Sequence, residues 1–301
     1  QYRGDALKAQ LYSYDIEQST AGFITGNQSY QDKQTLESSE LDDGYRNAQG
    51  LVGIMSLGQD QHRVDLYGRY HKMDFNMHWF PTVPVEKNQH SSVGLLGKHH
   101  WDMIQNTQLH VEWNVERTEG QLLEVQEAST QFSFVQGTHY DYQVVKNEQT
   151  ASLFLSGKRG KLNWVTGVRS SWVEYDSENL TDSNTVGRYK RLANRSDRYH
   201  FLSPFVLAQY RHSQRASWRL RLDHAHRAQE VNDLYRRVDG QGEEFIPEES
   251  NRYLELRYQW SGENTLFSQQ FYYYQKDNFY FRDADGDNIL GETQHYGFDG
   301  E

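Results

Sequence analysis

The feature that most constrains the fold is a two-residue alternation between apolar and charged side chains. In segment 109–116, one phase is apolar and the other is polar or charged. The apolar phase holds Leu109, Val111, Trp113 and Val115, and the other phase holds His110, Glu112, Asn114 and Glu116. Successive side chains of a β-strand point to opposite faces, so this pattern predicts a strand with one apolar and one charged face. The same division recurs in segments 63–71, 218–223 and 253–260, which indicates an all-β chain.

Short polar turns separate these strands at a regular interval. We expect them near residues 15–19, 58–61, 102–105, 157–160, 211–214 and 261–264. Much longer connections are expected between them, at about residues 30–43, 76–90, 118–147, 176–197 and 225–250. Alternating short and long connections are typical of an antiparallel up-and-down transmembrane β-barrel, with short periplasmic turns and long extracellular loops. Six such hairpins predict twelve strands, and the segment after Gln294 begins a thirteenth.

Aromatic residues gather beside the expected short turns, most of them in the apolar phase of their strand. They are Tyr12, Tyr14, Trp101, Trp164, Tyr210, Trp218, Tyr258 and Trp260. An interfacial girdle of aromatic side chains would place them there. The strands of a soluble β-sandwich also alternate, but they are usually about five or six residues long. The alternation here often runs to ten residues or more, which favours the membrane barrel.

Composition excludes several other classes of protein. The longest apolar stretches, 51–58 and 201–208, are far shorter than the ~20 residues that a spanning helix needs. Disorder is disfavoured because the 7 Trp, 21 Tyr and 14 Phe need apolar surroundings. The net charge of −11 argues against nucleic acid as a partner. Without Cys, the chain can form neither a disulfide nor a thiolate metal site.

Two pairs of segments toward the end of the chain resemble a known family. The first pair is DHAHRAQEVNDLY at 223–235 and FIPEESNRYLELRY at 245–258. The second pair is FYYYQKDNFYF at 271–281 and HYGFDGE at 295–301. These segments are similar to a late-barrel loop and the strands that follow it in TonB-dependent outer-membrane receptors. The rest of the chain agrees with that family in the rhythm of its turns.

The resemblance implies a function for the whole protein and a position for this chain within it. Family members have an N-terminal plug domain, a short segment that engages TonB, and a 22-stranded barrel with a plugged lumen. We expect residues 1–301 to be a partial barrel domain without a plug, about 12–13 strands of the larger barrel. The family implies uptake of a ferric siderophore or a similar scarce nutrient, energy-coupled through TonB by parts outside this chain. It also implies the outer membrane of a Gram-negative bacterium, with membrane lipid and lipopolysaccharide as partners.

Two alternatives remain open. A self-contained passive porin of 12–14 strands is compatible with the pattern, because bacterial barrels have even strand numbers from eight upward. A soluble β-sandwich binding protein is a third class. No arrangement of nucleophile, base or paired carboxylates stands out from chance, so we expect neither enzyme activity nor a cofactor.

Two basic clusters are the candidate ligand-binding residues. The first cluster, in segment 187–198, holds Arg188, Tyr189, Lys190, Arg191, Arg195 and Arg198. Asp197 is the only acidic residue in that segment. The second cluster holds Arg227, Tyr235, Arg236 and Arg237. On extracellular loops these cations could attract an anionic ligand by charge steering, or bind the phosphates of outer-leaflet lipopolysaccharide.

No metal site is expected. Loop 283–288 is rich in Asp, but it places Gly fourth and Gln twelfth, which does not fit an EF-hand. His99 and His100 are adjacent and point to opposite faces of a regular strand, whereas His224 and His226 can share a face. We expect His224 and His226 to contact water or lipid headgroups.

Overall fold

The computed structural model describes residues 7–19, 44–59, 61–76, 85–126, 137–181, 194–229, 246–282 and 288–300, with the backbone alone at 280–282 and 288–289. These residues form one antiparallel sheet of twelve strands, and the order of the strands in the sheet is their order in the chain. The strands are β1 (Leu7–Ser19), β2 (Tyr45–Gln59), β3 (His62–Asn76), β4 (Val85–Asp102), β5 (Thr107–Gln126), β6 (Gly137–Arg159), β7 (Leu162–Asn179), β8 (Arg195–Arg211), β9 (Ala216–Arg227), β10 (Glu249–Ser261), β11 (Leu266–Arg282) and β12 (Asn288–Gly300). Among the residues described, no helix is long and apolar enough to cross a membrane.

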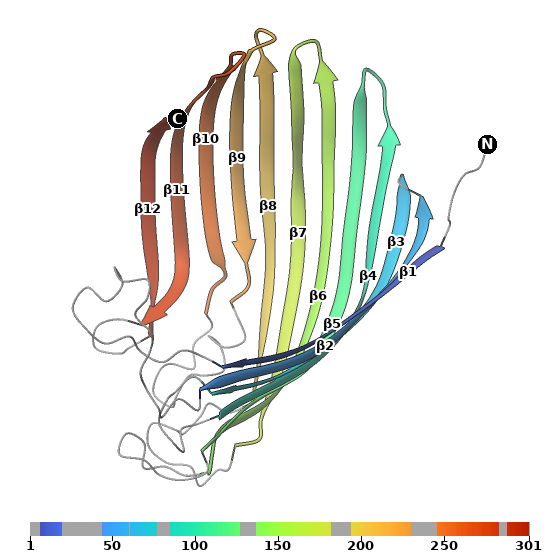
Figure 1. Ribbon diagram of the computed structural model, residues 1–301, viewed down its shortest axis with the longest axis vertical. Coiled ribbons are helices and arrows are strands. Elements are labelled where there is room, and N and C mark those ends of the chain that lie inside the picture. Colours follow the sequence, from blue (N-terminus) through green and yellow to red (C-terminus); the bar gives the residue numbers. More distant parts are fainter. Residues whose placement is uncertain are drawn as a thin grey trace.

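The sheet is a tall, curved wall (Figure 1). Five short connections join β2 to β3, β4 to β5, β6 to β7, β8 to β9 and β10 to β11, all at one end of the wall. The strand ends that the longer connections join lie at the opposite end of the wall, as the sequence predicts. A single sheet has no second sheet packed on it, so the β-sandwich alternative is wrong for the described part of the chain.

The strand ends differ from the sequence predictions in three ways. The short turn expected at 15–19 is wrong, because β1 runs through Ser19 and pairs there with Tyr45. Gln294 lies inside β12, so it begins no thirteenth strand. The connection expected at 118–147 is shortened to 127–136, since β5 and β6 extend into it. Beyond the bilayer the outer face of a strand meets water instead of lipid, so the apolar and charged contrast fades before the strand ends.

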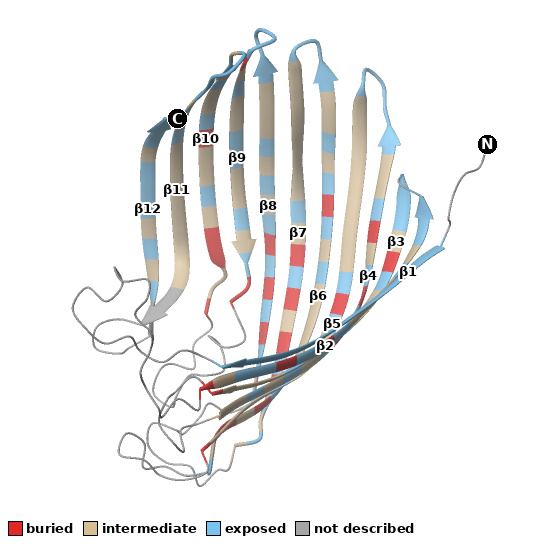
Figure 2. Ribbon diagram, viewed as in Figure 1, coloured by how far each residue is buried: buried red, intermediate tan, exposed pale blue. Residues whose placement is uncertain are grey.

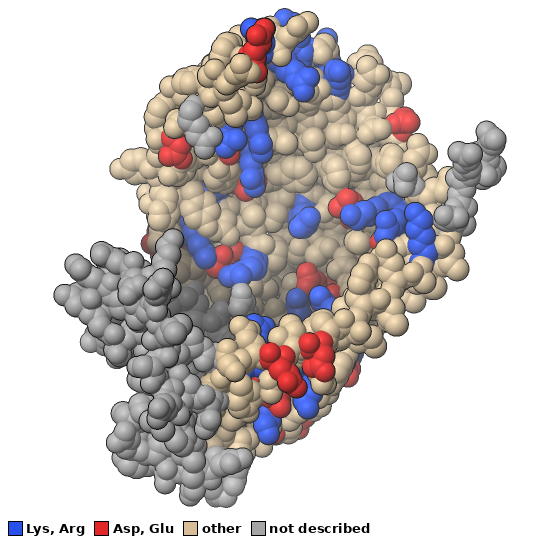
Figure 3. All heavy atoms as spheres, in the orientation of Figure 1, with Lys and Arg blue, Asp and Glu red and all other residues tan. Residues whose placement is uncertain are grey.

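The two phases of the strands lie on the two faces of the wall, as predicted. From β5 and β10, Leu109, Val111, Trp113, Leu254, Leu256 and Trp260 share the outer face, and Glu112, Asn114, Glu255 and Arg257 share the inner face. The inner face is the hollowed one, where Lys, Arg, Asp and Glu side chains gather (Figure 3). On the outer face, Val93, Leu153 and Leu202 are each more than half exposed. Such an apolar surface fits lipid, as on a membrane barrel.

The aromatic girdle is confirmed in part. Trp101, Tyr210 and Trp218 lie at the end of the wall that carries the short connections and are 43%, 47% and 44% exposed. Tyr14 differs because no short turn follows it. Its hydroxyl instead bonds the Nδ1 atom of His71 on the inner face, at 2.5 Å.

Buried residues are concentrated toward the long connections, mainly in β5 to β8 (Figure 2). The apolar cluster there lies on the inner face of β6, β7 and β8. It is made of Tyr140, Tyr142, Val144, Val173, Tyr175, Tyr199 and Phe201, covered by Ala228 and Ile246. Val173, Tyr175 and Phe201 of this cluster also line a cavity on the inner face.

Candidate functional site

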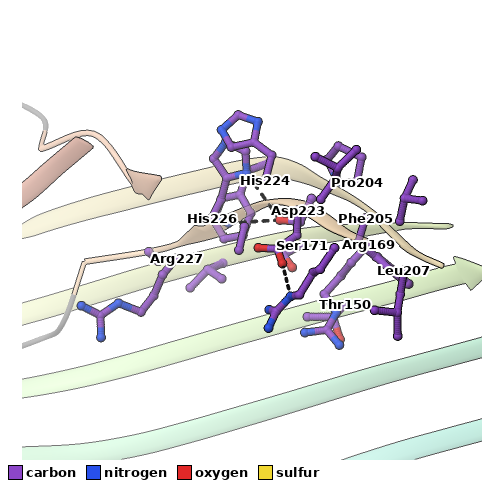
Figure 4. Close-up of a pocket in the computed structure, with 18 of the residues that line it drawn as sticks. Thr150, Arg169, Ser171, Pro204, Phe205, Leu207, Asp223, His224, His226 and Arg227 are labelled. Carbon is purple, nitrogen blue, oxygen red and sulfur yellow. Dashed lines mark hydrogen bonds and ion pairs between the residues drawn. The ribbon is translucent and has the colours of Figure 1, made fainter. Parts of the chain in front are cut away.

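A cavity of about 580 Å³ lies on the inner face between β6 and β9 (Figure 4). Its apolar walls include Val165, Val173, Tyr175, Phe201, Phe205 and Leu207. Its charged lining consists of Lys146, Glu148, Arg169, Arg219, Arg221, Asp223 and Arg227. Five cations therefore face two carboxylates, in a chain whose net charge is −11. We call this cavity the inner-wall pocket.

The pocket exists because two neighbouring strands separate. β8 and β9 pair only as far as Phe205 and Asp223, although β8 continues along β7 to Arg195. β9 meanwhile continues along β10 to Arg227. Pro204 stands next to the last paired residue of β8 and has no N–H group to extend the ladder. The inner-face side chains of β7, β8 and β9 line the space that this separation opens.

Four of the five cations have a carboxylate partner. The pairs are Lys146–Glu148 at 2.5 Å, Arg221–Asp223 at 2.6 Å, Arg227–Glu249 at 3.0 Å and Arg219–Glu255 at 3.7 Å. Arg169 differs, since its Nε donates to the Oγ of Ser152 at 3.2 Å and no described carboxylate lies within ion-pair distance. Its side chain is exposed to the pocket. Arg169 is therefore the cation best placed to meet an anionic group that enters the pocket.

Two tyrosines bond the backbone of Gln229 and Ile246, the described residues on either side of the connection between β9 and β10. Tyr175 donates its hydroxyl to the backbone oxygen of Gln229 at 3.3 Å, and Tyr199 donates to that of Ile246 at 3.0 Å. Tyr199 stands 12 residues before Arg211, the end of β8, beyond the about 9–11 residues that cross a bilayer. Burial, together with the charge of Asp197, raises the pKa of Tyr199 above its ordinary value. Tyr199 therefore stays a neutral hydrogen-bond donor.

The buried amide of Gln229 completes this rim. It donates to the backbone oxygens of Pro247 at 2.9 Å and Asn278 at 2.8 Å. It thereby joins the end of β9 to the start of β10 and to the irregularity in β11 near Asn278. The rim thus has a fixed position above the pocket.

Glu249 holds two cations at the same level of the wall. Its carboxylate lies 3.0 Å from Arg227 and 3.0 Å from the Nζ of Lys276. Burial alone would raise the pKa of Glu249, but hydrogen bonds from Lys276 and Asn251 and the charge of Arg227 lower it below its ordinary value. Glu249 is therefore an anion at neutral pH and fixes Arg227 at the edge of the pocket.

The predicted ligand-binding residues fall in three places. Arg227 lines the pocket. Arg195 and Arg198 lie in β8 rather than in a loop, and on opposite faces: Arg195 pairs with Asp197 at 2.5 Å, and Arg198 pairs with Glu174 at 2.6 Å. The remaining seven, Arg188, Tyr189, Lys190, Arg191, Tyr235, Arg236 and Arg237, lie outside the described residues.

The histidine geometry follows the sequence prediction. His99 contacts His62 and Trp101, whereas His100 faces His110 on the other side of the sheet. The rings of His224 and His226 lie together, with centroids 4.1 Å apart. The described residues contain no group of three or more His, Cys, Asp or Glu that could hold a metal ion, and loop 283–287 lies outside them.

Sequence reasoning did not single out Lys146, Arg169, Arg219 or Arg221. Arg219 and Arg221 belong to the charged phase of segment 218–223, which places them on the inner face. The alternation does not predict that β8 separates from β9. Arg219 and Arg221 line a pocket because of that separation. Pro204, within a strand pattern, is the one sequence feature that points to it.

The whole chain matches the family described as TonB dependent receptor-like, beta-barrel, over residues 1–301. The chain belongs to the TonB-dependent receptor family. Receptors of this family are outer-membrane transport proteins of Gram-negative bacteria. Among curated protein sequences, none matches the chain significantly.

Solved structures with a similar fold are also TonB-dependent receptors. The ferric citrate transporter FecA, unliganded, has a TM-score of 0.72 at 12% identity, over 98% of this chain and 44% of that protein. The ferric-catecholate import receptor Fiu from E. coli K12 has a TM-score of 0.62 at 10% identity, over 97% and 52%. The siderophore receptor PiuA from Acinetobacter baumannii has a TM-score of 0.61 at 11% identity, over 97% and 51%. This TonB-dependent receptor barrel thus spans about half the length of the proteins it resembles.

Proposed function

We propose that this chain forms part of the barrel of an outer-membrane receptor that takes up a ferric siderophore or a similar anionic metal chelate. The observation that carries the proposal is the inner-wall pocket, where Arg169 has no carboxylate partner among the described residues and apolar walls lie beside it. Apolar walls with a few placed polar groups are typical of small-molecule sites. An anionic chelate would provide Arg169 with the negatively charged partner that it does not have among the described residues.

Energy coupling through TonB is part of the same proposal. It would need a plug domain and a TonB-contacting segment in the full-length protein, and the plug would occupy the hollow of the wall. The charged inner face is suited to such a polar partner (Figure 3). Lipid would cover the outer face, and lipopolysaccharide its extracellular rim.

The passive porin is the weaker alternative. The outermost strands β1 and β12 are not paired with each other. An unpaired strand edge is costly in lipid because no water satisfies its backbone groups. Further strands beside β1 and β12 would remove that cost, as they would in a larger receptor barrel.

The basic segment 187–198 remains a proposed capture site. Arg188, Lys190 and Arg191 would draw an anionic chelate toward the pocket by charge steering. Arg195 contributes less, because its guanidinium is already held by Asp197.

Uptake of radioactive iron from a panel of ferric chelates tests the function. The panel contains citrate, catecholate and hydroxamate complexes, and cells with and without the gene are compared. We expect uptake of one chelate to disappear with the gene, and also in cells that lack TonB. Uptake that persists without TonB would support the porin, and uptake unchanged by the gene deletion for every chelate would contradict the proposal.

A further inference from the structure

His224 and His226 face the same space where β8 and β9 separate. Their ring centroids lie 4.1 Å apart, closer than those of the His71–His90 pair at 5.0 Å or the His100–His110 pair at 5.7 Å. Two imidazole nitrogens bound to one metal ion at about 2.0–2.1 Å lie about 3 Å apart in a cis arrangement. Rings this close reach that spacing with small side-chain rotations.

The Nε2 atom of His224 is buried and has no hydrogen-bond partner among the described residues. Both histidines border the pocket where β8 and β9 separate, but they belong to the same phase of β9 as Leu222 and lie on the opposite face from Arg219 and Arg221. Figure 4 shows them beside each other on β9. An unpaired polar nitrogen shielded from water is unfavourable. A metal ion is a partner that would satisfy it.

The neighbouring strand holds His226 in place. Ser203 on β8 accepts the backbone N–H of His226 at 3.1 Å, and its Oγ lies 3.4 Å from the Nδ1 atom of the same ring. The ring also stacks on Phe201 at 5.6 Å. A hydrogen bond at one ring nitrogen orients the other toward a metal, as is usual for metal-ligating histidines.

The charges around the pair do not exclude a cation. Three arginines lie nearby, and each has a carboxylate partner. The pairs are Arg221–Asp223 at 2.6 Å, Arg227–Glu249 at 3.0 Å and Arg252–Asp277 at 3.9 Å. Their charges largely cancel, so a divalent ion meets little net repulsion.

We propose that His224 and His226 form a two-nitrogen site for a divalent transition metal ion of the Cu²⁺, Ni²⁺ or Zn²⁺ class, with its remaining coordination positions open. Imidazole suits these ions, and Cu²⁺ binds such ligands most tightly. The His71–His90 pair is less suitable because its ring centroids lie 5.0 Å apart, against 4.1 Å for His224 and His226. The proposal does not depend on which chelate the receptor takes up, or on whether it takes up a chelate at all.

Binding of Cu²⁺ alone to the full-length protein in detergent tests the proposal. Titration calorimetry gives the affinity, and electron paramagnetic resonance counts the ligating nitrogens. We expect one Cu²⁺ with two imidazole nitrogens, and one nitrogen with at least tenfold weaker binding in His226→Gln. Ser203→Ala, which frees the ring, should weaken Cu²⁺ about tenfold while keeping both nitrogens.

The paired control is His71→Gln with His90→Gln, which removes the other close pair and should leave this Cu²⁺ signal unchanged. A second measurement uses the unaltered protein, so it does not depend on the folding of variants. Cu²⁺ should protect His226 from diethyl pyrocarbonate, read by mass spectrometry. Equal modification with and without Cu²⁺, or an unchanged two-nitrogen signal in the His224→Gln, His226→Gln variant, would overturn the proposal.

Discussion

Two regions of the inner face use charged residues in different ways. On β3 to β5, Tyr67 reaches across β4 and bonds Asn114 at 3.0 Å and Glu116 at 2.7 Å. Glu116 also accepts from Arg69 at 2.5 Å and from Thr118 at 3.0 Å. On β6 to β9, by contrast, the strands separate and Arg169 keeps no carboxylate partner among the described residues. The first region holds strands together, whereas the second leaves charge available to something that is not part of this sheet.

The largest effect on the first region is expected from a side chain at Gly94, which the Tyr67 ring covers. A Cβ atom at Gly94 would lie 2.4 Å from the Tyr67 ring, which is too close. Gly94→Ala should displace the ring and its two hydrogen bonds and lower the free energy of unfolding of the full-length protein by about 1–3 kcal/mol. Urea unfolding followed by fluorescence measures this.

Gly68→Ala on β3 is the matched control. The nearest described atom to a Cβ there is 3.8 Å away, so stability should hardly change. If both variants were equally stable, the contact between Tyr67 and Gly94 would contribute nothing to the wall.

Arg169→Gln sharpens the comparison from the other side. It should weaken binding of the chelate identified by the uptake assay about tenfold, or about 1.4 kcal/mol, while stability changes by less than about 0.5 kcal/mol, as is usual at exposed sites. Arg69→Gln should lower the stability and leave the affinity for the chelate unchanged, because it breaks the ion pair with Glu116. Isothermal titration of both variants decides, and equal affinities in the two would remove the functional distinction between the regions.

Neutralising Arg188, Lys190 and Arg191 together should have a smaller effect. We expect binding to weaken a few-fold at low salt and the loss to shrink as salt rises, because screened charges steer less. Arg195 is left intact, since its removal would strand the buried carboxylate of Asp197. Equal affinity of the triple variant and the wild type at low salt would exclude this segment from ligand capture.

The smallest expected effect is a pH dependence at the rim of the second region. The pKa of Glu249 is lower in the folded protein than its unfolded value of about 4.3. Its contribution to stability is therefore complete above that unfolded value and is lost as the pH falls through the lower folded value. Glu249→Gln should remove this slope below about pH 4.5 in chemical unfolding measured from pH 6 to pH 3. An unchanged slope would assign the acid sensitivity to other carboxylates.

The sequence predicted the parts of the fold that follow from local alternation. Trp113 points to the bilayer and Glu112 to the lumen. Because these two environments favour apolar and charged side chains respectively, the two-residue pattern predicts which face each residue occupies. The ends of β1 and β5 leave no such record, because the outer face of the strand no longer meets lipid there. The turn expected at 15–19 was wrong for this reason, since polar residues such as Asp15 and Glu17 continue a strand.

The pocket could not be predicted in the same way. It depends on where β8 stops pairing with β9, and on the inner-face position of Arg169 relative to strands far along the chain. Tyr67 and Glu116 are likewise 49 residues apart and meet only because β4 between them carries Gly94. Contacts of this kind depend on register, which the pattern of a single strand does not contain.

The central claim is that the apolar phase of this wall faces lipid and the charged phase faces the lumen. The chain contains no Cys, so spin labels can be attached at single introduced cysteines. Val111→Cys and Leu256→Cys sample the outer face, and Glu112→Cys and Arg257→Cys sample the inner face. In the full-length protein in liposomes, oxygen should relax the outer labels much more strongly than the inner ones, and a water-soluble nickel complex should not reach the outer labels. Equal oxygen accessibility for the two sets, or the reverse order, would contradict the account.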